Sequence, residues 1–313
     1  MTPSVALPPG LRVFERGWLS SNNILIGGAQ STALIDSGYS THAPQTLALV
    51  ARALADRPLD VLINTHLHSD HCGGNAALQQ RYPKLKTNIP PGLSESVRNW
   101  DPEALSYAPT GQSCPRFTFD AVLQPGREMV LGDLTWQVHA APGHDPHSVV
   151  LFEPVSQVLV SADALWERGF GVVFPELDGA NAFDEVSATL DVIESLTPLA
   201  VIPGHGAPFS GVGQAIDIAR RRLDVFQRQP ERHIHYAVKA LLMFKLLELQ
   251  SVEQSALRQW AESTSFFTSI HRRHFAATDS GQWVDTLVAD LVKSGVVSRI
   301  GTAIAPTQQV SKP

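Results

Sequence analysis

One short run of side chains constrains this chain more than any other feature: His66-Leu67-His68-Ser69-Asp70-His71. It follows residues 59–64, a short apolar stretch that predicts a buried strand. Because residues i and i+2 of an extended segment point the same way, His66 and His68 can address one metal ion. Asp70 and His71, one turn further on, can address a second ion nearby. Imidazoles and a carboxylate are ligands that Zn²⁺ accepts, so the run predicts a metal site rather than a solvated polar turn.

Three further side chains stand directly beyond predicted strands, where such a site needs them. They are His144, Asp163 and His205, and the strands before them are predicted at 135–140, 157–161 and 199–202. A single histidine after Pro-Gly is more often a turn residue than a ligand. Strand ends, however, lie on one rim of packed sheets, so in the company of the 66–71 run these residues are predicted to join the same metal site.

The remaining patterns predict two successive groups of short strands with helices between them. Short apolar runs that end at turn residues predict strands, and apolar residues at three- and four-residue spacing predict helices. Further strands are predicted at 11–14, 23–26, 31–35, 128–131 and 148–152, with helices at 44–55 and 183–196. This order indicates an α/β protein in which sheets pack together under covering helices. Periodicity fades over about 84–127, which we expect to be an insertion.

The C-terminal part of the chain differs in pattern and in charge. Helices are predicted at 215–226, 233–249, 252–261 and 284–294, before a β-ribbon at 296–304, an order that resembles a winged-helix module. Residues 1–214 carry 11 Lys and Arg against 21 Asp and Glu, whereas residues 215–313 carry 13 against 9. We therefore expect a catalytic domain over 1–212 and a mostly helical C-terminal region over 213–313.

Composition and charge restrict the partners and the compartment. The C-terminal balance of +4 (13 minus 9) is too small to predict nucleic-acid binding. No apolar run approaches the ~20 residues of a membrane span, and the first ten residues lack a basic and apolar export signal. We expect a cytoplasmic protein without a membrane partner. With two cysteines and no CxxC pair, any metal site must use histidine and carboxylate.

These motifs, in their order and spacing, closely resemble the five-motif pattern of the metallo-β-lactamase superfamily. The matching positions are Asp36, the 66–71 run, His144, Asp163 and His205. The resemblance covers about residues 11–210 and implies an αββα sandwich with metal ions at its rim. Asp36 is similar to the family's aspartate that orients a ligating imidazole without binding metal itself.

The resemblance also implies how the ligands divide between two ions. One ion would be bound by His66, His68 and His144. The other would be bound by Asp70, His71 and His205, and Asp163 would bridge the two. This division places every ligand predicted from the sequence in a dinuclear centre.

The resemblance implies hydrolysis at two zinc ions, with a small-molecule thioester, lactone or ester as the substrate. Two dications ~3.5–4 Å apart hold a shared hydroxide at neutral pH and polarise the oxygen of the substrate. Asp70 is the candidate catalytic residue that orients this water or takes up its proton. Fe and Mn are alternatives to zinc. Other family members suggest two alternative activities: persulfide dioxygenation at a single iron, and RNA cleavage by nucleases with a winged-helix-like tail.

Residues near the expected site leave the substrate open. Asp163 in place of cysteine favours the glyoxalase II and lactonase branches, but Trp166 stands where quorum-signal lactonases commonly have tyrosine. His147 replaces a usual glycine and either lines the pocket, acts as an acid or braces the backbone. The arginines 220–222 either contact glutathione or face solvent. The apolar segment 170–175 either floors a pocket, forms a homodimer contact or lies in the core.

Overall fold

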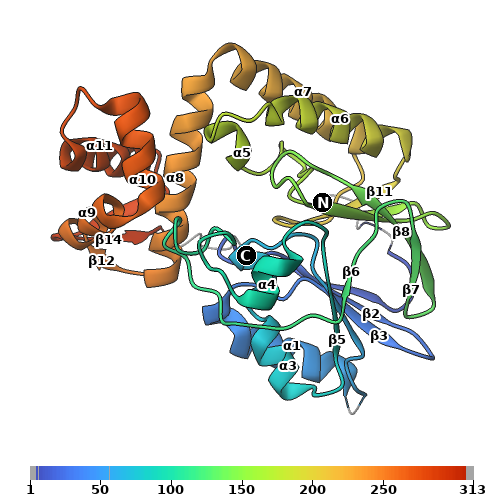
Figure 1. Cartoon of the computed structure of the whole chain (residues 1–313). Coiled ribbons are helices and arrows are strands. Elements are labelled where there is room, and N and C mark those ends of the chain that lie inside the picture. The colour runs from blue at the N-terminus through green and yellow to red at the C-terminus, as the bar shows by residue number, and fades with distance from the viewer. Residues whose placement is uncertain (1–4, 6, 56, 308–313) are drawn as a thin grey trace.

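The computed structural model describes residues 5, 7–55 and 57–307. Positions 1–4 and 6, part of the segment expected to lack an export signal, lie outside the described residues. Two β-sheets pack face to face and helices cover the outer face of each, which gives the layers seen in Figure 1. The α/β sandwich expected from the sequence is confirmed. No helix in the described ranges is both long and apolar enough to cross a membrane.

The first sheet orders its strands β1-β2-β3-β4-β5-β6. They are β1 (Leu11–Phe14), β2 (Asn23–Gly27), β3 (Thr32–Ile35), β4 (Val61–Ile63), β5 (Lys86–Ile89) and β6 (Ala121–Val122). The strands β1 to β3 pair antiparallel, and β3 to β6 run parallel. The stretch 84–127, expected as an insertion, therefore supplies β5 and β6 of this sheet. The residues that leave the sheet lie between these strands and include the short helix α4 (Ser94–Asn99).

The second sheet orders its strands β11-β10-β9-β8-β7. They are β7 (Glu128–Leu131), β8 (Leu134–Ala140), β9 (Val149–Glu153), β10 (Val158–Ala162) and β11 (Ala200–Pro203). Successive strands from β7 to β10 are antiparallel, whereas β10 and β11 are parallel. It follows that β8, β10 and β11 run in one direction and end at the same edge.

Strands that are buried on both faces explain the continuous apolar runs in the sequence. In β10, Val158 and Val160 face the core between the sheets, whereas Leu159 faces the core beneath the covering helices. In β4, Ile63 faces the core between the sheets and Leu62 faces the helices on the other side. Both faces of each central strand therefore contribute to a core.

A pair of helices covers each outer face of the sandwich. They are α1 (Ala43–Leu54) and α3 (Asn75–Arg81) on the first sheet, and α6 (Ala182–Ser195) and α7 (Val212–Arg228) on the second. Val50 and Leu78 pack in the core of the first pair, and Leu190 and Ala219 pack in the core of the second. The helix α7 thus packs with the sandwich, while the division of the chain at residue 212 stays a prediction.

The C-terminal region is built from helices and a small antiparallel sheet. Its elements are α8 (Pro230–Leu249), β12 (Val252–Glu253), α9 (Gln254–Ser263), α10 (Ser265–Ile270), the π-helix η2 (His271–Phe275), α11 (Ser280–Lys293), β13 (Val297–Ile300) and β14 (Ala303–Pro306). In Figure 1 the long α8 stands between the sandwich and the remainder of this region. These elements share one apolar core, which also contains Val172 and Leu177 from the loop and short helix after β10. The expected helical C-terminal region is confirmed.

The core between the sheets predicts a matched pair of stability effects. Leu151 in β9 is fully buried between the sheets, whereas Leu199, just before β11, is 64% exposed. Because Leu151→Ala leaves a cavity in close-packed surroundings, we expect the free energy of unfolding to fall by about 2–5 kcal/mol. Leu199→Ala should change it by less than about 0.5 kcal/mol. Urea unfolding of both variants measures the difference, and equal losses would contradict the packing described for Leu151.

Candidate metal centre

Seven His and Asp side chains gather in two groups where the strands end. Within each group, one candidate ligand atom from every member lies within 4.8 Å of those of the others. The first group is His66, His68 and His144, and the second is Asp70, His71, Asp163 and His205. The structure therefore brings together all of the side chains that the sequence predicts as metal ligands.

The short helix α2 (Ser69–Cys72) carries Asp70 and His71 and lies close against the loop after β3. A Cβ on Gly73 would lie 2.6 Å from the amide nitrogen of Ser40, and one on Gly74 would lie 2.5 Å from the carbonyl oxygen of Ser37. A side chain at either position would collide with backbone atoms, so the close approach requires glycine. This explains the glycine pair that follows the ligand run.

The imidazoles of the first group face one another. His144 donates its Nδ1 proton to the carbonyl oxygen of Val172 at 2.5 Å, which leaves the Nε2 lone pair for the site. That Nε2 atom lies 2.9 Å from Nδ1 of His68. The Nε2 atom of His66 is buried and, within the described chain, has no hydrogen-bond partner. Inward-facing imidazole nitrogens of this kind are the donor arrangement of a metal site.

Asp163 lies between the two groups. One of its carboxylate oxygens is 3.4 Å from Nε2 of His144, and the other is 3.6 Å from Nε2 of His71. Asp70 Oδ2 lies 3.1 Å from Nε2 of His205 and 3.7 Å from Nε2 of His71. The Asp163 carboxylate therefore reaches members of both groups, which is the position that a bridging ligand needs.

Two buried nitrogen atoms test whether these residues suit a metal ion. Nε2 of His66 and Nε2 of His71 have no hydrogen-bond partner among the residues that the structure describes. A buried polar atom without a partner costs free energy, and a coordinated cation removes that cost by accepting the lone pair. The donors present are imidazole nitrogen and carboxylate oxygen, the set that cations such as Zn²⁺ accept. The residues fit a dinuclear metal centre.

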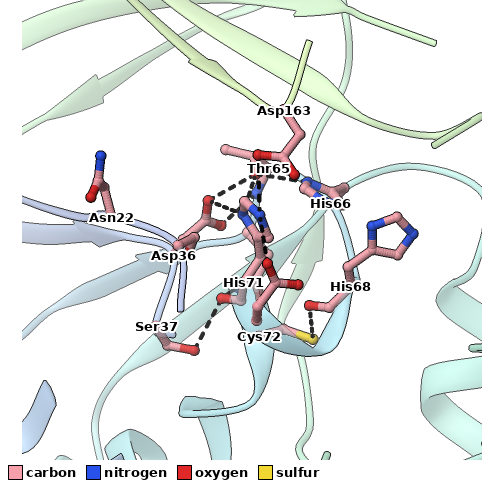
Figure 2. A network of polar contacts seen from close by, with 12 residues as sticks. Asn22, Asp36, Ser37, Thr65, His66, His68, His71, Cys72 and Asp163 are labelled. Carbon is pink, nitrogen blue, oxygen red and sulfur yellow. Dashed lines mark hydrogen bonds and ion pairs between the residues drawn. The ribbon is translucent and has the colours of Figure 1, made fainter. Parts of the chain in front are cut away.

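Asp36 lies behind the His71 ring rather than among the ligand atoms. Figure 2 shows its carboxylate directed at Thr65 and His71. Oδ2 of Asp36 accepts hydrogen bonds from Nδ1 of His71 and from the Thr65 hydroxyl, both at 2.8 Å, and Oδ1 accepts one from the Thr65 amide at 2.9 Å. Because Asp36 accepts the Nδ1 proton, Nε2 is the ring nitrogen of His71 that faces the site. Asp36 has a φ of 57°, a left-handed conformation that aspartate tolerates better than most residues.

Burial and the neighbouring carboxylates set the charge of the site. Burial lowers the pKa of His68 and of His144 to about 4, so both rings are neutral near pH 7 and offer lone pairs. Burial lowers the pKa of His71 as well. The neighbouring carboxylates, of which Asp36 has the largest effect, outweigh burial and raise this pKa well above its usual value. For Asp163, the nearby histidines outweigh burial and hold the pKa of the carboxyl well below its usual range. The site thus contains ionised carboxylate, which attracts cations.

The loop between β1 and β2 ties the two sheets together beside the site. The amide of Ser21 donates to the carbonyl oxygen of Asp70 at 3.0 Å, and the amide of Asn22 donates to that of Gly204 at 2.7 Å. The Asn22 side chain donates to the carbonyl oxygen of Pro203 at 3.0 Å, across a separation of 181 positions. Sequence reasoning missed Asn22, because nothing in the surrounding sequence indicates so distant a partner.

The structure places the two expected pocket residues differently. Trp166 lies at the site, because its Nε1 donates to Oδ1 of Asp163 at 3.2 Å. His147 lies against Gly92, where a Cβ would come within 2.3 Å of Nδ1 of the His147 ring. Its amide donates to Oδ1 of Asp145 at 2.7 Å, so the backbone around His147 is braced. Its role in a pocket or as an acid stays a prediction.

Two other sequence features have structural explanations. Phe170 is buried in the core beneath α6 and α7, and Val172 is buried in the core of the C-terminal region, so these two residues of the segment 170–175 lie in the core, whereas Phe174 lies beside the ring of His68. Arg220 forms ion pairs with Asp191 and Glu194, both at 2.7 Å and exposed. Its guanidinium is therefore engaged on the helical face, away from the ligand groups.

Orientation of His71 by Asp36 predicts a specific effect on metal affinity. Asp36→Asn removes the charge that holds the Nδ1 proton of His71, so we expect zinc affinity to fall by roughly 10–100-fold. Asp60→Asn is the matched control, because Asp60 also bonds backbone and hydroxyl groups, those of Thr32, but lies away from the ligands. Competition with a chromophoric chelator measures both. Unchanged affinity in Asp36→Asn would contradict the orienting role.

The space at Gly204 yields a second prediction about metal binding. A Cβ at this position would lie 2.1 Å from Oδ1 of Asp163, so Gly204→Ala must displace the carboxylate that joins the two groups. We expect a fall in zinc affinity of roughly 100-fold, comparable to the loss of a strong orienting contact. Gly213→Ala in α7 is the control, because its Cβ would meet open space. Elemental analysis after dialysis compares the two; equal metal content would refute the steric argument.

Known proteins with similar sequences belong to a family of metal-binding proteins, in agreement with the ligand groups described above. The sequence model of the Metallo-beta-lactamase superfamily matches residues 16–205. The hydroxyacylglutathione hydrolase of Brucella anthropi is 29% identical over 217 residues, which cover 66% of this chain and 66% of that protein. The hydroxyacylglutathione hydrolase of Anaeromyxobacter dehalogenans is 30% identical over 161 residues, which cover 51% of this chain and 52% of that protein. The chain thus spans between half and two thirds of the length of these relatives.

Solved structures share the fold over nearly the whole chain. A metallo-beta-lactamase family protein from Thermus thermophilus has a TM-score of 0.56 at 19% identity and covers 96% of this chain and 100% of its own. A beta-lactamase domain protein from Burkholderia ambifaria has a TM-score of 0.57 at 20% identity, with coverage of 97% and 94%. With the family match across most of the sandwich and the ligand groups at its rim, the chain belongs to the metallo-beta-lactamase superfamily.

Proposed function

We propose that this chain is a metal-dependent hydrolase that holds two Zn²⁺ ions and cleaves a small-molecule thioester, lactone or ester. The observation that carries the proposal is the position of Asp163, whose two oxygens lie 3.4 Å from Nε2 of His144 and 3.6 Å from Nε2 of His71. A carboxylate shared between two ligand groups suits a pair of ions rather than a single one. The second group retains every member that a second ion needs.

Each group would hold one ion. The first ion would take His66, His68 and His144, the second would take Asp70, His71 and His205, and Asp163 would serve both. When bound, two such ions supply a nucleophile derived from water at neutral pH and polarise the substrate's carbonyl oxygen. An imidazole-rich set with carboxylates suits zinc, and iron and manganese are the alternatives.

Asp70 is the residue that we assign to the attacking water. Burial raises the pKa of its carboxyl, but His71 and His205 outweigh burial and lower it, so Asp70 is ionised near pH 7. Its Oδ2 atom faces Nε2 of His205 at 3.1 Å. An ionised carboxylate accepts a hydrogen bond from water and so orients its lone pair toward the substrate.

The relatives named hydroxyacylglutathione hydrolase support a thioester as the scissile group. The names of these relatives do not establish that the thioester of this chain's substrate is attached to glutathione. Arg220, a candidate for contact with glutathione, forms ion pairs with Asp191 and Glu194 instead. The presence of Asp70 and His205 in the second group favours hydrolysis over oxygen chemistry at a single iron. A net charge of +4 over residues 215–313 gives little support to an RNA substrate.

Metal analysis and a substrate panel test the proposal together. Protein purified without chelator should contain about two zinc ions per chain and hydrolyse at least one member of a thioester, lactone and ester panel. Because His68 belongs to the first group, His68→Ala should lower kcat/KM by roughly 100-fold or more. His274→Ala, in the exposed part of the π-helix η2, is the matched control and should retain activity.

A different set of results would overturn the assignment. One iron per chain, oxygen uptake with a persulfide and no hydrolysis would replace the hydrolase with a dioxygenase. Full activity in His68→Ala would remove the first group from the reaction. Neither result would alter the fold.

A further inference from the structure

Trp18, in the loop between β1 and β2, is an exposed aromatic residue at the metal centre. Its ring stacks on the imidazole of His205, with ring centroids 5.2 Å apart and planes inclined by 11°. The side chain is nevertheless 54% exposed. One face of the indole therefore lies on a predicted metal ligand while much of the remaining surface is open to solvent. A single exposed apolar residue is ordinary on a protein surface, but its position against a ligand imidazole is not.

Trp166 completes a corner around the same imidazole. Its ring meets Trp18 edge to face at 5.3 Å and meets His205 edge to face at 5.6 Å. Its indole N–H is occupied, because it donates to Oδ1 of Asp163 at 3.2 Å. We call the corner formed by Trp18 and Trp166 over His205 the aromatic corner. It offers apolar ring surface, and the N–H of Trp166 points toward the metal centre.

The opposite side of the centre is also aromatic. The ring of Phe174 lies 5.3 Å from that of His68 and 5.9 Å from that of His144, and Phe266 of α10 packs on Phe174 at 6.1 Å. Among the residues that the structure describes, no Lys or Arg side chain forms an ion pair or hydrogen bond with a member of either ligand group. The described neighbours on this side of the centre are therefore aromatic rings, with no basic side chain paired to a ligand.

We propose that the aromatic corner is a specificity site, in which the open face of Trp18 binds an aromatic ring or similar flat apolar group of the substrate. This inference rests on the proposed function, because the group would stand next to the bond that the metal centre cleaves. The physical basis is stacking of a flat apolar group on an indole whose other face is already fixed by His205. It narrows the substrates to esters, thioesters or lactones that carry such a group beside the scissile bond.

Binding of two phosphonates to the zinc-loaded protein tests this without turnover. Phenylphosphonate and methylphosphonate present the same anionic head to the metal centre and differ in the ring. We expect the wild type to bind phenylphosphonate roughly tenfold more tightly in isothermal titration calorimetry. The preference should vanish in Trp18→Ala and persist in Trp18→Phe, which keeps an aromatic face. Leu199→Ala is the control for the loss of an exposed apolar side chain and should keep the preference.

The ratio of the two affinities separates specificity from simple support of His205. A Trp18 that only braced the imidazole would, when removed, weaken both phosphonates equally and leave the ratio unchanged, and that result would overturn the proposal. Equal binding of the two phosphonates to the wild type would overturn it as well. If the ring preference depends on Trp18 but no ester, thioester or lactone is cleaved, the proposed function fails and the aromatic corner stands as a binding site.

Discussion

The cost of burying polar and charged side chains is the constraint on which the rest of this structure depends. His66, His71 and Asp163 are at most 5% exposed, and such groups are stable in an interior only when they are paired or bound to metal. Two ligands have the nitrogen that faces away from the site hydrogen-bonded. Nδ1 of His71 donates to Asp36, and Nδ1 of His144 donates to the carbonyl oxygen of Val172. Nε2 of His66 and Nε2 of His71 lie inside the site and have no hydrogen-bond partner among the described residues, and a bound cation would satisfy them.

Strand direction brings the ligands to one place from distant parts of the chain. Because β8, β10 and β11 run the same way, the residues that follow them, His144, Asp163 and His205, meet at one edge of the second sheet. In the first sheet, β3 and β4 are parallel, so Asp36 and His66 also leave their strands at a common edge. Hydrogen bonds from the β1–β2 loop to Asp70 on one side and to Pro203 and Gly204 on the other then hold the two edges next to each other.

The ligand positions could be predicted because the 66–71 run, His144, Asp163 and His205 come after short apolar stretches, which can be recognised locally in the sequence. The division of the ligands between two ions was predicted from the family resemblance. Side chains that act between the sheets could not be predicted: Asn22 resembles any polar loop residue, and Trp18 meets His205 only in the folded chain. The strands β5 and β6 were hidden for a different reason. Lys86–Ile89 has three polar residues and only one apolar residue, so no alternation marks it as a strand, and Ala121–Val122 is too short to show any periodicity.

Within the described residues, the C-terminal region supplies no member of either ligand group, yet it determines what surrounds them. Phe266 of α10 packs on Phe174, whose ring stands at the edge of His68, and its amide donates to the carbonyl oxygen of Pro109 at 2.9 Å. The loop after α4 and the aromatic wall of the site are therefore both positioned from outside the sandwich. The C-terminal region also supports a ligand, because the carbonyl oxygen that accepts the Nδ1 proton of His144 belongs to Val172, which is buried in the core of that region. The C-terminal region therefore acts on a metal ligand and on the aromatic surroundings of the site at the same time, so a change in its packing should reach both.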